Sequence, residues 1–127
     1  MEPMQTHGAF SWNELMTPEP AKAAEFYGSL FGWTIESMEM PMGTYRVIKV
    51  GGVPIAGMMN NPDPSQPVPP HWSAYITVEN VDATVEACPK LGGTVLVPIM
   101  EIPGVGRMAV LKDPQGAVVN VITYKSS

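Results

Sequence analysis

The residue best suited to chemistry is Glu14, which lies in an apolar stretch near the start of the chain. The run Phe10–Thr17 predicts a strand, and side chains two residues apart in a strand share a face. Trp12 and Met16 therefore flank the Glu14 carboxyl group. Between such neighbours the charged form is desolvated, so we expect the pKa of Glu14 to lie above its ordinary value, which suits a general base.

Glu14 also has a structural interpretation. A salt bridge with Arg46 or Arg107, or a place at the wet mouth of a cavity, would explain an inward-facing carboxylate without any catalytic role. An opposite charge would lower the pKa of Glu14 instead of raising it. The two interpretations therefore predict opposite shifts.

A second polar residue in apolar surroundings is Asn120, which stands between Val119 and Val121 in a predicted final strand. A buried amide needs hydrogen-bond partners. Asn120 therefore either orients a ligand or bonds Ser73 or a neighbouring strand.

Two similar stretches of sequence position these residues. After the first strand, Thr17 resembles an N-cap, and apolar residues recur at helical spacing over Ala21–Phe31. Gly32 ends this helix and Gly92-Gly93 ends a second one over Asp82–Leu91, which points to an internal duplication. Further strands are predicted at residues 33–40, 44–50, 53–59, 72–78, 94–100, 107–111 and 117–124.

The two stretches define two modules of one domain covering residues 1–127. Module one occupies about 10–59 and module two about 71–124. Residues 60–70 between them contain five prolines, a density that excludes a helix or a central strand. We expect an ordered but irregular connector there.

Several motifs together resemble the vicinal oxygen chelate superfamily, which includes glyoxalase I, extradiol dioxygenases, and fosfomycin- and bleomycin-resistance proteins. The similar segments are Glu25–Gly28 with Leu30–Trp33, Val78–Asp82 with Leu91–Gly93, and Asp113–Gly116. The resemblance covers about Phe10 to Tyr124. It implies an α+β fold of two tandem βαβββ modules whose sheets form an open, barrel-like cavity with the helices outside.

Members of this superfamily that use a metal carry its ligands in the first and last strand of each module. The corresponding positions here are Trp12, Gly57, Ser73 and Asn120. None of them is the imidazole or carboxylate that a divalent ion prefers. The sequence therefore predicts a metal-free member without a cofactor, as the bleomycin-resistance proteins also are.

The resemblance, combined with strand alternation, implies which side chains face the cavity. Besides Glu14, the candidate ligand-binding residues are Trp12, Met16, Gly57, Met59, Ser73, Tyr75, Asn120 and Ile122. Their apolar and aromatic character predicts binding of a small, partly apolar or aromatic molecule.

Two other functions stay open from the sequence. One is a metal-independent isomerase or lyase in which Glu14 removes a proton next to a carbonyl group and Asn120 or Tyr75 stabilises the oxyanion. The other keeps a metal on Glu14, His71 and Glu101. Whether the chain is an enzyme is therefore not decided by the sequence.

The composition of the chain limits which partners and which cellular compartment we expect. The 127 residues carry 7 Lys and Arg against 12 Asp and Glu, a formal net charge of −5, so a nucleic-acid partner is not expected. The one cysteine, Cys88, excludes an intramolecular disulfide. With no apolar run long enough for a membrane helix and no secretory signal, we expect a cytoplasmic protein. Exposed sheet edges favour a homodimer.

Overall fold

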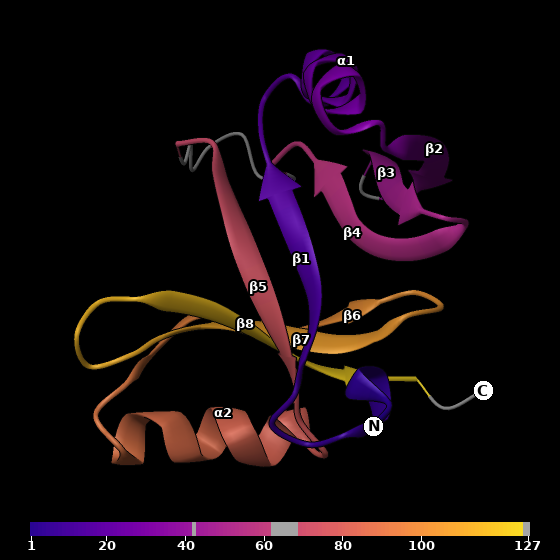
Figure 1. Ribbon diagram of the computed structural model, residues 1–127. Coiled ribbons are helices and arrows are strands. Elements are labelled where there is room, and N and C mark those ends of the chain that lie inside the picture. Colours follow the sequence, from indigo (N-terminus) through magenta and orange to yellow (C-terminus); the bar gives the residue numbers. More distant parts are fainter. Residues whose placement is uncertain (42, 62–68, 126–127) are drawn as a thin grey trace. The chain divides into compact units, whose positions relative to one another are not determined.

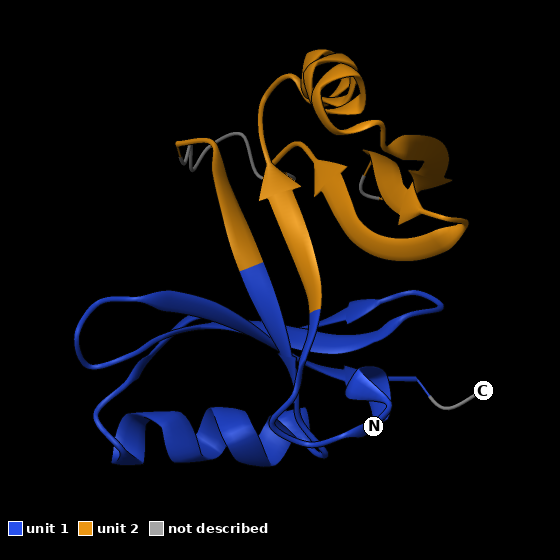
Figure 2. Cartoon of the chain, viewed as in Figure 1, with its two compact units in different colours: residues 1–11, 74–127 blue, residues 12–73 orange. Residues whose placement is uncertain are grey.

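The computed structural model describes residues 1–41, 43–61 and 69–125. In this part the chain forms two compact units, coloured separately in Figure 2. Unit 1 comprises Met1–Ser11 and Ala74–Ser127, and unit 2 comprises Trp12–Ser73. Figure 1 shows the elements, which are the 3₁₀ turn η1 (Pro3–Gln5), β1 (Phe10–Met16), α1 (Pro20–Phe31), β2 (Thr34–Met40), β3 (Gly43–Val50), β4 (Val53–Met59), β5 (His71–Thr77), α2 (Val81–Lys90), β6 (Thr94–Ile102), β7 (Gly106–Lys112) and β8 (Val118–Tyr124).

Unit 2 is a sheet with one helix, and its strands follow the order β2-β3-β4-β1. Strands β2, β3 and β4 are antiparallel neighbours, whereas β1 and β4 run parallel. The core on one face of this sheet consists of Leu15, Ile48, Ala56 and Met58. Ala23, Ala24 and Tyr27 of α1 pack against these residues, so α1 covers that face.

Helix α1 begins later than the sequence indicated. Thr17 is not its N-cap, because the helix starts at Pro20 and Glu19 holds the cap position without a side-chain hydrogen bond. The Thr17 hydroxyl accepts instead from the Glu19 backbone N–H at 3.3 Å, a local turn that competes with helix formation. The predicted end is confirmed, because Gly32 adopts the left-handed conformation with φ of 73°.

Unit 1 has strand order β5-β8-β7-β6 and the helix α2. Its core contains Val78, Val81, Ala109, Leu111 and Val121, with Val85 and Cys88 of α2 packed against them. Val81, Val85 and Cys88 thus form the face of α2 that packs on the sheet. The Asn80 side chain caps the helix by accepting from the Ala83 N–H at 3.1 Å.

The N-terminal segment is hydrogen-bonded to β5 within unit 1. Gly8 N–H donates to the Thr77 carbonyl, Thr77 N–H donates to Ala9, and the Thr77 hydroxyl donates to the Pro3 carbonyl. Ser11 and Tyr124 join their hydroxyl groups at 2.8 Å. Burial raises the pKa of Tyr124, and this hydrogen bond offsets part of that rise.

The predicted α+β fold with two βαβββ modules is confirmed, because each module contributes one helix and four strands in the expected order. Most of the predicted connector, residues 62–68, lies outside the described residues. The shared barrel cavity and the single-domain assignment stay predictions. In the described part of the chain, no helix is long and apolar enough to span a membrane.

Candidate functional site

Strand register places the first group of predicted residues on one face of unit 2. Glu14 pairs with Gly57 and Met16 pairs with Met59 across the parallel strands β1 and β4. Their neighbours Leu15 and Met58 belong to the core that α1 covers. Because alternate residues point to opposite sides of a sheet, the other side carries Trp12, Glu14, Met16, Gly57 and Met59. We call this side the Glu14 face.

Glu14 is the buried carboxylate of this face, with 6% of its surface exposed. The Tyr45 hydroxyl donates to Glu14 Oε2 at 2.9 Å, and the indole N–H of Trp12 donates to the Tyr45 oxygen at 2.9 Å. Ser73 on β5 adds a long contact, 3.5 Å, from its hydroxyl to the Glu14 backbone carbonyl. A buried carboxylate needs a donor such as the Tyr45 hydroxyl to offset its lost hydration.

Gly57 provides the space for this arrangement. A Cβ atom at position 57 would overlap the Tyr45 ring and its hydroxyl oxygen. Gly57 also pairs with Val47 of β3, two residues from Tyr45. The absent side chain therefore lets the Tyr45 ring lie across β4 and reach Glu14 on β1. At a position where the resemblance implied a metal ligand, this chain accommodates an aromatic ring.

Three further predicted residues, Tyr75, Asn120 and Ile122, belong to unit 1 and share a face of its sheet. Tyr75 pairs with Asn120 across the parallel strands β5 and β8, and Met108 pairs with Ile122. Asn120 and Ile122 are 6% and 2% exposed, and the Tyr75 hydroxyl contacts Met108 Sδ at 3.8 Å. Val121, the residue between Asn120 and Ile122, packs in the core under α2. These candidates thus lie on the face of their sheet opposite α2.

The arginines proposed as Glu14 partners have other surroundings. Arg107 binds Asp82 at 2.8 Å and Glu101 at 3.1 Å. The hydrogen bond with Glu101 and the charge of Asp82 raise the pKa of the Arg107 guanidinium. In the chain outside 42, 62–68, 126 and 127, Arg46 has no carboxylate within salt-bridge distance. The Glu14 side chain accepts instead from the Tyr45 hydroxyl of the same unit.

The described side chains do not form a metal-binding cluster. Among the described residues, no three His, Cys, Asp or Glu side chains come close enough together to hold an ion. His71 Nδ1 lies 2.8 Å from the Pro69 carbonyl, and Glu101 binds Arg107. At the family ligand positions of unit 2, Trp12 offers only a donor and Gly57 offers no side chain. These residues do not fit a divalent cation.

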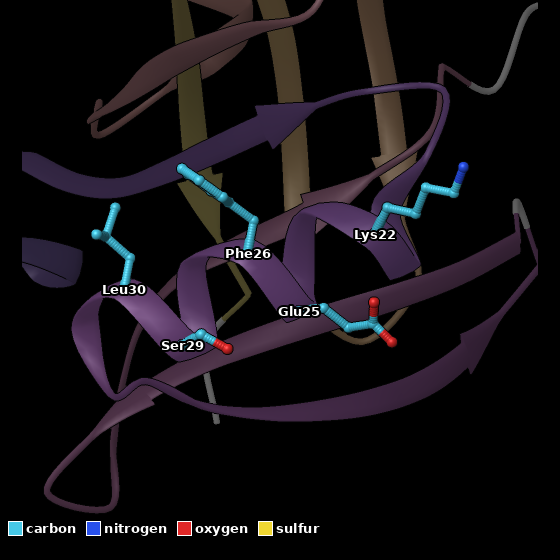
Figure 3. Close-up of a pocket in the computed structure, with 5 residues that line it drawn as sticks. All are labelled: Lys22, Glu25, Phe26, Ser29 and Leu30. Atoms are coloured by element: carbon cyan, nitrogen blue, oxygen red, sulfur yellow. The ribbon is translucent and has the colours of Figure 1, made fainter.

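A separate hollow lies on the outer side of α1 and carries none of the predicted site residues. It is lined by Lys22, Glu25, Phe26, Ser29 and Leu30, whose side chains project from successive turns in Figure 3. Phe26 and Leu30 are 61% and 57% exposed. Lys22, Glu25 and Ser29 form the rest of its lining, so this hollow combines exposed apolar and polar side chains of a single helix.

The sequence analysis missed Tyr45, the residue that connects Trp12 to Glu14. Its position in a strand of mixed polarity gave no signal of its own. The signal was Gly57, because glycine inside a strand marks a place where another group approaches closely. From the sequence, Gly57 was predicted as a replaced metal ligand and a cavity-facing position, but not as the space for an aromatic ring.

The family model for the glyoxalase/bleomycin resistance protein/dioxygenase superfamily matches residues 9–121. The chain belongs to this superfamily. A putative glyoxylase, CFP32, of Mycobacterium bovis is 44% identical over 116 residues, which are 91% of this chain and 44% of the relative. The anthracycline biosynthesis protein DnrV of Streptomyces peucetius is 31% identical over 123 residues, covering 87% of this chain and 45% of the relative.

Solved structures with a similar fold are also known. A methylmalonyl-CoA epimerase from Streptomyces coelicolor superposes with a TM-score of 0.69 at 13% identity, covering 95% of this chain and 100% of that one. At this identity the likeness concerns the fold alone. The chain spans less than half the length of both curated relatives.

Proposed function

We propose that this superfamily member binds a small, partly aromatic molecule at the Glu14 face. The observation that carries the proposal is the hydrogen-bonded chain from Trp12 through Tyr45 to the buried Glu14 carboxylate. Aromatic and thioether side chains with a few convergent polar groups are typical of small-molecule sites. Trp12 and Met16 keep partial exposure beside the buried carboxylate, so this face combines apolar contact area with a hydrogen-bonding anchor.

The names of the relatives are compatible with a small organic ligand. The Streptomyces relative is an anthracycline biosynthesis protein, and the mycobacterial relative is a putative glyoxylase. We carry over from them only the expectation of a small organic ligand, because the chain matches less than half of either protein. The polar anchor adds a requirement of its own. A carboxylate accepts hydrogen bonds, so a ligand bearing an O–H or N–H donor fits Glu14.

We further propose that binding needs no metal. Trp12 and Gly57 offer no ligand atom for a divalent ion, and Ser73 and Asn120 are weak ligands compared with imidazole or carboxylate. Elemental analysis of protein purified without chelator should find less than about a tenth of an equivalent of zinc, nickel, iron or manganese. About one equivalent of any of these metals per chain would refute this part of the proposal.

Binding is tested with a naphthol, which pairs an aromatic body with a single hydroxyl donor. Naphthol should quench the protein fluorescence saturably, because Trp12 lies on the Glu14 face. Naphthalene, which has the same rings without the hydroxyl, should bind more weakly by about ten-fold, the equivalent of one hydrogen bond to a charged group. Equal affinities for the two compounds would contradict an anchoring role for the carboxylate.

A second candidate function is a metal-independent isomerase or lyase acting on a small carbonyl compound. The observation that favours it is the burial of Glu14, which places a potential base in a site with little water. In an isomerisation, Glu14 would take a proton from the carbon next to the carbonyl and return it to another atom of the same molecule. Glu14→Gln should then abolish turnover while leaving the affinity within a few-fold. In the binding function the same change alters affinity alone.

A further inference from the structure

We infer that Tyr45 is a positioning residue, and that Trp12 and Tyr45 together hold Glu14 as the ionised hydrogen-bond acceptor of the site. This inference deepens the proposed function and rests on it for its biological meaning. Its physical content, the state of one carboxyl group, is measurable without any ligand. Tyr45 lies on β3, separated from β1 by β4.

The direction of the two hydrogen bonds follows from the chemistry of the donors. An indole nitrogen can only donate, so the 2.9 Å contact from Trp12 Nε1 makes the Tyr45 oxygen an acceptor. The phenol has one proton, and its 2.9 Å contact with Glu14 Oε2 directs that proton to the carboxyl group. Glu14 Oε2 is therefore an acceptor. A hydrogen bond donated to a carboxylate favours the charged form.

The position of the phenol is set by close packing. The Tyr45 ring occupies the space that a Cβ atom at Gly57 would need. Since Gly57 stands beside Glu14 in register, the ring ends at the carboxyl group. Trp12, two residues before Glu14 on the same strand, holds the Tyr45 oxygen by its indole hydrogen bond. Strands β1 and β3 thus supply the hydrogen-bonded side chains, and Gly57 of β4 supplies the space between them. This preorganisation distinguishes the chain of hydrogen bonds from a chance surface contact.

The other titratable groups of the strands next to β1 in unit 2 bind elsewhere or point to the other side of the sheet. Strand β4 has none in its sequence. On β3, Arg46 pairs with Met58 and so points to the side covered by α1, while Lys49 binds Glu36 of β2. On the segment of β5 in this unit, the exposed His71 lies against the Pro69 carbonyl.

The consequence concerns ligand choice. Burial alone would favour a protonated Glu14, which could donate to a carbonyl or carboxylate of a ligand. The Tyr45 hydrogen bond acts in the opposite direction and keeps Glu14 an acceptor. The site should therefore prefer ligands with O–H or N–H donors, such as aromatic alcohols, over their ethers and over aromatic carboxylates.

The test is a titration of Glu14 in the full chain by NMR with glutamate labelled at its side-chain carboxyl carbon, the signal being assigned with Glu14→Gln. Tyr45→Phe keeps the ring and removes the hydroxyl, so the pKa of Glu14 should rise by about one to two units relative to wild type. Trp12→Phe frees the phenol to turn away and should raise the pKa by a smaller amount. The double variant should rise no further than Tyr45→Phe, because Trp12 acts through Tyr45.

The matched control is Tyr27→Phe. It removes a second tyrosine hydroxyl of unit 2 that accepts from an indole, since Trp72 Nε1 donates to Tyr27 at 3.3 Å. This change should leave the Glu14 titration as in wild type. The inference is overturned if Tyr45→Phe leaves the titration unchanged, or if the two single shifts add in the double variant. Failure of naphthol to bind wild-type protein would instead count against the proposed function and leave these shifts intact.

Discussion

At the scale of single residues, Gly57 has the largest structural consequence for the site. It lies between Glu14 and Val47 in the sheet, and its missing side chain makes room for the Tyr45 ring. Replacing it by any other residue forces the ring away from Glu14. The carboxylate would then lose the hydrogen bond from the Tyr45 hydroxyl.

We predict that Gly57→Ala destabilises the fold by about 1–3 kcal/mol, the usual cost of overpacking. Gly28→Ala is the matched control, because a Cβ there meets its nearest neighbour at 3.7 Å and alanine favours the helix by about 0.5–1 kcal/mol. Urea unfolding of both variants measures the difference. Tyr45→Ala should make Gly57→Ala much less costly, and additive effects of the two changes would contradict the proposed contact.

The direction in which individual side chains point was predictable where strand alternation alone determines it. Strand alternation from Trp12 predicted Glu14 and Met16 on one side of the sheet, and the pairing of β1 with β4 places both residues on the Glu14 face. It did not find Tyr45, because a contact across an intervening strand depends on pairing and ring orientation. Neither property can be read from local sequence.

At the scale of elements, the two helices begin differently. The Asn80 side chain caps α2, whereas Glu19 at the start of α1 makes no capping bond through its side chain. From the sequence, a capping side chain was predicted for the first helix, at Thr17. Proline explains the difference, since Pro18 and Pro20 restrict the residues before them and delay the helix.

We predict that Asn80→Ala costs about 1 kcal/mol of the free energy of unfolding, because it leaves the Ala83 N–H without its cap. Glu19→Ala should cost less than about 0.5 kcal/mol. It removes only an exposed salt bridge with Lys22, and such pairs contribute little. Thermal or urea unfolding compares the two variants, and equal losses would show that the capping bond is not stabilising.

The strands were predicted within a few residues because glycine and proline mark the turns between them. The helix faces were less predictable. In α1 the apolar spacing included Phe26 and Leu30, yet both are exposed and the core contact is made by Ala23, Ala24 and Tyr27. Hydrophobic periodicity identifies an apolar face but does not say what covers it.

At the scale of the whole molecule, that exposed face bears on the predicted homodimer. Phe26, Leu30 and Phe31 are each more than half exposed, and contiguous apolar surface of this kind often marks an interface. We predict that the wild-type chain forms a dimer in solution at micromolar concentration. Leu30→Glu should shift it toward monomer, whereas Val118→Glu, at an exposed apolar position of unit 1, should not.

Light scattering distinguishes the outcomes. A wild-type mass near 13.7 kDa would contradict the dimer. A dimer unaffected by Leu30→Glu would place the interface elsewhere, for example at the exposed strand edges.

The fold was predictable as a whole because it rests on a repeated order of elements and several motifs in fixed sequence. The identity of the ligand was not predictable, because it depends on the shape of a surface built from strands that are distant in the sequence. For the same reason, the relatives do not identify the ligand of this chain. They establish the superfamily, but side chains such as Tyr45 and Gly57 determine what this member can hold.

The central claim, that Glu14 anchors a donor-bearing aromatic ligand, is tested most directly by the affinity of Glu14→Gln for naphthol. Fluorescence titration should show an affinity about 10–100-fold weaker than wild type, since a charged hydrogen-bond acceptor is lost from a buried position. Glu25→Gln changes a carboxylate at the α1 hollow and should bind naphthol as wild type does. Wild-type affinity in Glu14→Gln, or weakened binding in Glu25→Gln alone, would contradict the account.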